Sequence, residues 1–200
     1  MPETVSMPVW KTVEAYDSAA LILIHQRSVP VEEIKAAERE IGPELARELH
    51  RLCEGGVTRL DVVIDCMGGS TVAAMGIRIA LDKWEGAMRC LIDGDCFSSA
   101  TIIAFGPPWP VAITPGSMVI IHQPQMTRWH RSGAGPWTKE TRPSASQTLD
   151  HMRVIYSLRT GRPETETEEW ITQGKTFTAP QACACGLCDE MMPRREWEKG

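Results

Sequence analysis

Hydrophobic and polar positions follow two patterns along the chain: short apolar runs, and longer segments with apolar residues at helical spacing. The short runs predict buried strands, and they lie at 19–24, 59–66, 87–92, 111–114 and 118–121. The run at 59–66 is apolar enough to be buried on both faces, as in a parallel sheet. The helical segments lie at 31–41, 44–53, 70–84 and 98–105. Gly42-Pro43 separates the first two, because proline starts a helix well but is disfavoured in its interior.

Strands and helices in this alternation predict an α/β fold with right-handed crossovers. Residues 1–18 are polar and mixed, and we expect an arm there. Gln125 to Ser146 holds glycine, proline, arginine and two tryptophans without a clear period, which indicates an excursion from the compact body. Helical spacing returns at 145–159, and the acidic run at 164–169 opens a further helix, since acids favour a helix N-terminus. Residues 191–200 form a charged tail.

Composition narrows the function classes. The 200 residues are 42% hydrophobic and 24% charged, as in a globular domain. A formal charge of −5 argues against a nucleic-acid partner, which requires a basic surface. No apolar run is long enough to cross a bilayer and the N-terminus has no signal-peptide pattern, so we expect no membrane partner and a cytoplasmic location.

The seven cysteines are an odd number, which in a reducing compartment indicates free thiols. Three of them, Cys183, Cys185 and Cys188, cluster near the C-terminus. A structural zinc site needs four ligands, usually in two separated pairs, and no fourth ligand follows. We therefore predict neither a metal nor a cofactor.

Three features together indicate nucleophilic catalysis. Gly68 and Gly69 follow a strand and can present backbone N–H groups to an oxyanion, although such turns are common. Ser98 begins a helix of small residues, where a hydroxyl is either a nucleophile or a simple cap. His122 ends an apolar strand, and is either a general base or a structural histidine. Neighbouring strand ends would bring Ser98 and His122 together.

The residues around these features resemble the signature blocks of the Clp protease proteolytic subunit, a family of the Clp/crotonase superfamily. The blocks are Met67-Gly68-Gly69-Ser70, Gly94-Asp95-Cys96-Phe97-Ser98-Ser99-Ala100 and Met118-Val119-Ile120-Ile121-His122-Gln123-Pro124. The similarity extends from about Leu21 to Asp189.

The resemblance implies a repeated β-β-α superhelical α/β fold with a protruding handle at about 125–159. The domain would span 19–190, between an arm at 1–18 and a tail at 191–200. It also implies an ATP-dependent serine endopeptidase that forms a homo- or hetero-oligomeric ring, receives unfolded polypeptides from a Clp-type AAA+ unfoldase, and uses no cofactor. Substrate would bind along the handle as an added strand.

The same resemblance assigns roles to the site residues. Ser98 would be the nucleophile and His122 the general base. The N–H groups of Gly69 and Ser99 would form the oxyanion hole. Residues that would bind substrate are Gly68, Gln123 and Pro124.

The chain also departs from the family pattern. Met67 replaces a proline, Phe97 is bulky beside the oxyanion hole, and the position of the family's aspartate falls on Gly174. Because a glycine cannot orient an imidazole, either Glu168 or Glu169 would have to substitute, although both suit a helix start better.

Three hypotheses about the function stay open. The first is an active serine peptidase. The second is a weak or inactive paralogue with a structural role in a mixed ring, favoured by Gly174 and Phe97. The third is another superfamily member, either like a signal-peptide peptidase, against which the absent lysine base counts, or an acyl-CoA hydratase, whose chemistry calls for glutamates.

Overall fold

The structure, a computed structural model, describes residues 4–16, 18–106, 109–124 and 145–197. One mixed sheet forms its frame, with strand order β1-β2-β3-β4-β5-β8, and β6 continues the pairing from β4 to β7. Its strands are β1 (Thr4–Tyr16), β2 (Ala19–Pro30), β3 (Arg59–Cys66), β4 (Ala87–Phe97), β5 (Val111–Ile113), β6 (Met118–Ile120), β7 (Thr176–Thr178) and β8 (Glu190–Met191).

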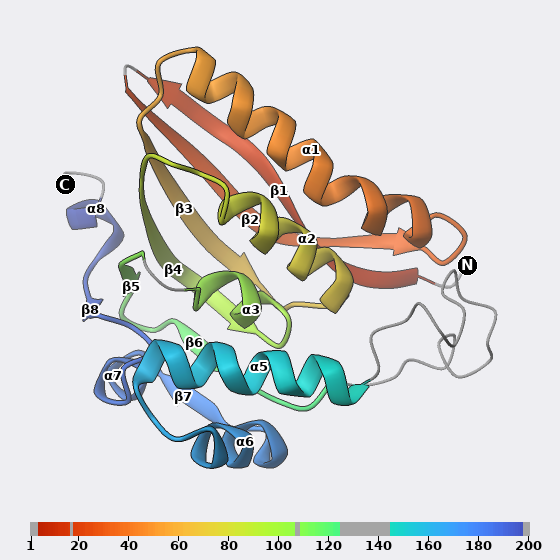
Figure 1. Cartoon of the computed structure of the whole chain (residues 1–200). Helices are drawn as coiled ribbons and strands as arrows, with labels where there is room; N and C mark the ends of the chain where they lie inside the picture. Colours follow the sequence, from red (N-terminus) through yellow and green to blue (C-terminus); the bar gives the residue numbers. More distant parts are fainter. Residues whose placement is uncertain (1–3, 17, 107–108, 125–144, 198–200) are drawn as a thin grey trace.

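Helices α1 and α2 lie across the β1–β4 part of the sheet, and α5, α6 and α7 gather around β6 and β7 (Figure 1). The helices are α1 (Ile34–Glu54), α2 (Thr71–Leu81), α3 (Ala100–Ala104), α5 (Ala145–Thr160), α6 (Glu164–Gln173), α7 (Ala179–Ala184) and α8 (Arg194–Trp197).

The central strands pair in parallel, β2 with β3 and β3 with β4. Val62, Val63 and Ile64 are all buried, so β3 is covered on both faces as its apolar run predicts. After this strand, Ser70 caps α2, and its side chain accepts a hydrogen bond of 3.2 Å from the Ala73 N–H. Parallel strands end at a common edge, and this edge carries the candidate site.

The expected N-terminal arm is wrong for residues 4–16, which form β1 in an antiparallel hairpin with β2. Met7, Pro8 and Val9 are buried and Val5 packs against the same core, so this strand is part of the core and not an arm. Trp10 also donates its indole N–H to the Ile41 carbonyl at 3.2 Å.

The expected break at Gly42-Pro43 is also wrong, because α1 continues through Pro43. A Cβ at Gly42 would lie 2.7 Å from the carbonyl oxygen of Gly76 in α2, so the two helices cross at a distance that only glycine permits. Buried Leu45 and Leu49 extend the apolar stripe beyond the proline. Tertiary packing thus outweighs the missing hydrogen bond.

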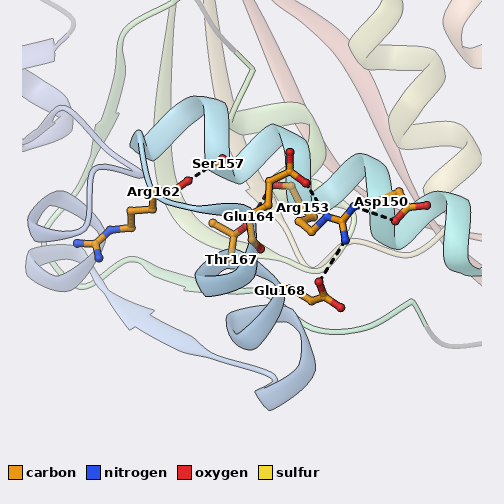
Figure 2. A network of polar contacts seen from close by, with 7 residues as sticks. All are labelled: Asp150, Arg153, Ser157, Arg162, Glu164, Thr167 and Glu168. Carbon is orange, nitrogen blue, oxygen red and sulfur yellow. Dashed lines mark hydrogen bonds and ion pairs between the residues drawn. The ribbon is translucent and has the colours of Figure 1, made fainter.

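The predicted handle lies largely at 125–144, outside the described residues. Its last part is the expected helix α5, which is held against α6 by the network in Figure 2. Arg153 on α5 is the centre of this network and pairs with Asp150 at 3.3 Å, Glu164 at 2.9 Å and Glu168 at 3.2 Å. The Thr167 hydroxyl donates to the Arg153 carbonyl at 3.1 Å, which fixes α6 from its first turns.

The C-terminal residues are less tail-like than expected. Trp197 of α8 is only 4% exposed, and the Arg89 guanidinium lies 4.2 Å from its ring centroid. Arg89 also binds buried Asp61 at 2.8 Å, so α8 is fastened to the sheet. The boundaries given for arm, domain and tail stay predictions.

Candidate active site

Ser98 stands at the junction of β4 and α3 with an unusual backbone. Its φ is +55°, and it is the one non-glycine residue with positive φ in the described ranges. This conformation costs an L-residue about 1–2 kcal/mol. The Ser98 N–H donates to the Ile120 carbonyl at 2.8 Å, which ties the serine to the neighbouring strand β6. Strain of this kind concentrates at functional sites.

The glycine pair lies directly beside this serine. A Cβ at Gly68 would approach the Phe97 carbonyl oxygen to 2.5 Å and the Ser98 Cβ and Ser99 N to 2.9 Å, so only glycine fits. Gly69, with φ of +128°, packs still more closely against the Ser6 carbonyl of β1. The structure thus places Gly68 against Ser98 and Ser99, whereas the contacts of Gly69 are with β1.

Two backbone N–H groups of these residues have no acceptor in the described structure. Within the described part of the chain, the N–H groups of Gly69 and Ser99 make no hydrogen bond, whereas the Gly68 N–H points at the Cys66 sulfur, 3.4 Å away. The Ser99 side chain is 1% exposed and its hydroxyl also has no partner there.

His122 follows β6, which pairs in parallel with the end of β4 through Phe97 and Ile120. It is half-buried, and its Nδ1 lies 2.7 Å from the Gln123 carbonyl oxygen. No hydrogen bond joins it to the Ser98 hydroxyl in the described structure. Catalytic hydrogen bonds are often long or poorly aligned before substrate binds, so the absence of this bond does not exclude the pair. Gln123 is exposed and Pro124 half-buried at the same edge.

Gly174 lies where the resemblance places the family's acid. The antiparallel pairing of β6 with β7 matches Ile120 to Thr176. The Ile121 N–H then donates to the Lys175 carbonyl at 2.9 Å. A Cβ at Gly174 would lie 3.9 Å from the His122 Cβ. Gly174 ends α6 in the left-handed conformation, with φ of +66°.

Neither suggested substitute contacts the histidine. The Glu168 carboxylate bonds to Arg153 at 3.2 Å (Figure 2), and Glu169 is exposed on α6. No carboxylate of the described residues bonds to His122. The substitution of either glutamate for the acid therefore receives no support from the geometry.

A buried hydroxyl chain supports the nucleophile from below, and the sequence did not predict it. The Thr101 hydroxyl donates to the Ser98 carbonyl at 2.5 Å. The Tyr156 hydroxyl lies 2.5 Å from the Thr101 oxygen, and this tyrosine is fully buried. Burial raises the Tyr156 pKa, so the hydroxyl stays protonated and donates. The only sequence signal was the helical period of α5, which does not indicate polar partners.

The cysteines near the site are buried, which disfavours the reactive thiolate form. Burial raises the pKa of the Cys66 thiol to about 11 and that of Cys90 to about 12, and it raises the Cys96 pKa as well. All seven cysteines are free. Across the described residues, no group of three or more histidine, cysteine, aspartate or glutamate side chains could hold a metal ion.

A strained serine at a strand-to-helix turn, with a glycine against it and a histidine just after the paired strand β6, is the kind of arrangement expected of a serine hydrolase on an α/β fold. The model of the Clp protease family matches residues 14–195. The chain therefore belongs to the Clp protease family, which confirms the resemblance seen in the sequence blocks.

Solved structures show the same fold. ClpP1 from Listeria monocytogenes is 13% identical with a TM-score of 0.63, over 83% of this chain and 97% of that one. An asparagine-to-aspartate mutant of the same protein is 14% identical with a TM-score of 0.64, over 78% and 86%. A lysine-to-alanine mutant of the 1510-N membrane-bound stomatin-specific protease, in complex with a substrate peptide, is 17% identical with a TM-score of 0.61, over 80% and 73%. The predicted ClpP-like α/β fold is confirmed, and the handle stays a prediction. Within the described ranges, no helix has the length and apolar character needed to span a bilayer.

Proposed function

We propose that the chain is a serine endopeptidase subunit of a Clp-type proteolytic complex, with Ser98 as nucleophile and His122 as general base. The observation that carries this proposal is the positive φ of Ser98, beside a glycine that tolerates no side chain. A helix-capping serine has no need of that conformation, whereas a nucleophile exposed above a sheet edge does.

The chemistry that we propose uses these groups in the following order. The His122 Nε2 takes the Ser98 proton as the hydroxyl oxygen attacks the peptide carbonyl, and the N–H groups of Gly69 and Ser99 stabilise the oxyanion. The C–N bond then breaks as His122 returns the proton to the leaving amine. Water hydrolyses the acyl-enzyme by the same route, which restores the serine. The flanking residues Gly68, Gln123 and Pro124 would hold the substrate strand.

The test is labelling with a fluorophosphonate probe, located by peptide mass spectrometry. We expect an adduct on Ser98 in the wild type, none in Ser98→Ala, and a loss of at least a hundredfold in labelling rate in His122→Ala. Ser28→Ala, which changes an exposed serine of β2, is the matched control and should label like the wild type. Absence of an adduct on folded wild-type protein would refute the assignment.

An inactive paralogue in a mixed ring is the second candidate. Gly174 favours it, because removal of the acid from a triad lowers the rate by about 10⁴-fold. It predicts a folded, assembled chain that takes no probe and neither hydrolyses peptides nor activates a partner ring.

Assembly and partners are proposed from the family. We infer a ring of like subunits in the cytoplasm, fed with unfolded polypeptide by a Clp-type AAA+ unfoldase. Val154 and Leu158 of α5 are 39% and 66% exposed, one helical turn apart, and offer apolar surface for contact between subunits. Light scattering tests the ring, and a monomer at micromolar concentration would contradict it. Degradation of an unfolded protein only with unfoldase and ATP tests the partner.

A further inference from the structure

The contact between His122 and its neighbour determines which ring nitrogen carries the proton. The His122 Nδ1 lies 2.7 Å from the Gln123 carbonyl oxygen. A carbonyl oxygen can only accept a hydrogen bond, so Nδ1 must donate and carry the proton. In the neutral ring, Nε2 then keeps its lone pair. This is the tautomer that a general base needs when Nε2 faces a serine.

In a Ser-His-Asp triad a carboxylate enforces that tautomer, but the corresponding position here has no side chain. Gly174 lies opposite His122 across the extended β6–β7 pairing, with its Cβ position 3.9 Å from the His122 Cβ. A side chain at 174 would therefore reach the imidazole. With glycine there, the nearest orienting acceptor in the described structure is the Gln123 carbonyl.

The direction of this carbonyl is constrained by the next residue. A residue before proline is restricted to extended conformations, with ψ of about +120° to +160°, because the proline ring clashes with it otherwise. Pro124 thus limits how far the Gln123 peptide can rotate. His25 offers a comparison, since its Nδ1 also faces the carbonyl of the next residue, Gln26, but at 3.2 Å and with Arg27 following instead of proline.

We propose that the main-chain carbonyl of Gln123, held in direction by Pro124, orients His122 and fixes its Nδ1–H tautomer in place of a carboxylate. The inference rests on the proposed function, in which His122 is the base. The carbonyl is a positioning group and does not touch substrate. It differs from a carboxylate in being neutral, so it stabilises the imidazolium that forms during attack less strongly.

The first experiment reads the tautomer without any need for activity. Ser98→Ala protein labelled with ¹⁵N is measured by long-range ¹H–¹⁵N correlation of the imidazole rings at a pH where they are neutral. We expect His122 as the Nδ1–H form, and a mixture of tautomers for His25, whose contact with the carbonyl is longer. Adding Pro124→Ala should lower the Nδ1–H fraction of His122 and leave His25 unchanged. A predominant Nε2–H form of His122 overturns the proposal.

The second experiment supplies the missing carboxylate. Aspartate tolerates left-handed backbone better than most residues, so Gly174→Asp is a workable change. Gly161→Asp is the matched control, because Gly161 has φ of +68° and open space around its Cβ position, at the end of α5. Both variants carry the same backbone cost and the same added charge.

The readout is the second-order rate of fluorophosphonate labelling of Ser98. If the Gln123 carbonyl already fixes the tautomer, aspartate adds only the difference between a charged and a neutral acceptor. We then expect a rise of about tenfold or less in Gly174→Asp and no change in Gly161→Asp. A rise of a thousandfold or more in Gly174→Asp would show an unoriented histidine and overturn the proposal.

The two experiments separate this proposal from the proposed function. If His122 is the Nδ1–H tautomer in a protein that takes no probe, the peptidase assignment is refuted and the proposed role of the Gln123 carbonyl is retained. If Ser98 is labelled while His122 is the Nε2–H tautomer, the role of the Gln123 carbonyl is refuted and the peptidase assignment is retained.

Discussion

The buried hydroxyl chain under Ser98 supports a stability prediction of defined size. The Tyr156 hydroxyl donates a hydrogen bond to the Thr101 hydroxyl, which donates in turn to the Ser98 carbonyl. Tyr156→Phe removes the first bond and leaves every donor satisfied, at a cost of about 1 kcal/mol. Its ring keeps the edge-to-face contact with Phe105, at 6.3 Å between centroids.

Thr101→Val has the larger effect because it leaves the fully buried Tyr156 hydroxyl without an acceptor, which costs about 2–3 kcal/mol. In the double variant no hydroxyl remains, and the Ser98 carbonyl still accepts the Thr101 N–H at 3.1 Å. We therefore expect a total of about 1–1.5 kcal/mol, less than the single threonine change.

The assay is urea unfolding of the four proteins at one fixed protein concentration, since assembly also affects stability. The double-mutant cycle should give a coupling energy of about 2 kcal/mol. The control cycle pairs Tyr156→Phe with Thr114→Val, whose buried hydroxyl bonds to Asp93 at 3.1 Å and shares no bond with Tyr156. Additivity in both cycles to within about 0.5 kcal/mol would refute the hydroxyl chain as a unit.

Three further predictions follow from the same structure. Gly68→Ala should abolish probe labelling of Ser98 and lower the unfolding free energy by at least about 2 kcal/mol. Gly56 has the same φ of +88° but open space around its Cβ position, so Gly56→Ala should lower the unfolding free energy by about 1 kcal/mol and leave labelling normal. Asp61→Ala should lower the unfolding free energy, measured in urea, by about 3–5 kcal/mol. The change leaves the Arg89 guanidinium, which lies 2.8 Å from the Asp61 carboxylate, without its buried partner. A loss of less than about 1 kcal/mol would contradict a stabilising role of this ion pair. Burial raises the Cys90 pKa from 9.0 to about 12, so the contribution of this thiol to stability is complete below pH 9 and is lost as the pH rises towards 12. The midpoint temperature of thermal unfolding should therefore fall less steeply with pH across that range in Cys90→Ala than in the wild type. An unchanged slope would contradict this prediction.

Much of the fold could be predicted because its signals are local. Strand β3 was placed at its observed bounds, since a continuous apolar run is unambiguous when turn residues flank it. Strand β1 was missed because Pro8 and the surrounding polar residues suggested an arm, although Val5, Met7 and Val9 lie at every second position. Proline is tolerated there because β1 is an edge strand.

The candidate site was predictable in its side chains and not in its backbone. Gly68, Ser98 and His122 came from short motifs, and the structure places Gly68 against Ser98. The positive φ of Ser98 depends on strand pairing with β6, which no local pattern specifies. The Gln123 carbonyl leaves no trace in the sequence at all, because every residue has one.

The register of β6 and β7 has a consequence for how this chain can vary. Because the Ile121 N–H bonds to the Lys175 carbonyl, the polypeptide between His122 and Gly174 leaves and returns at adjacent points. It is, in effect, a closed loop whose ends are fixed by the sheet. Closing a loop costs only about 0.6 kcal/mol more each time its length doubles. Lengthening this stretch between its buried positions, among them Tyr156 and Trp170, therefore adds little closure energy, so its length can change while the histidine keeps its place.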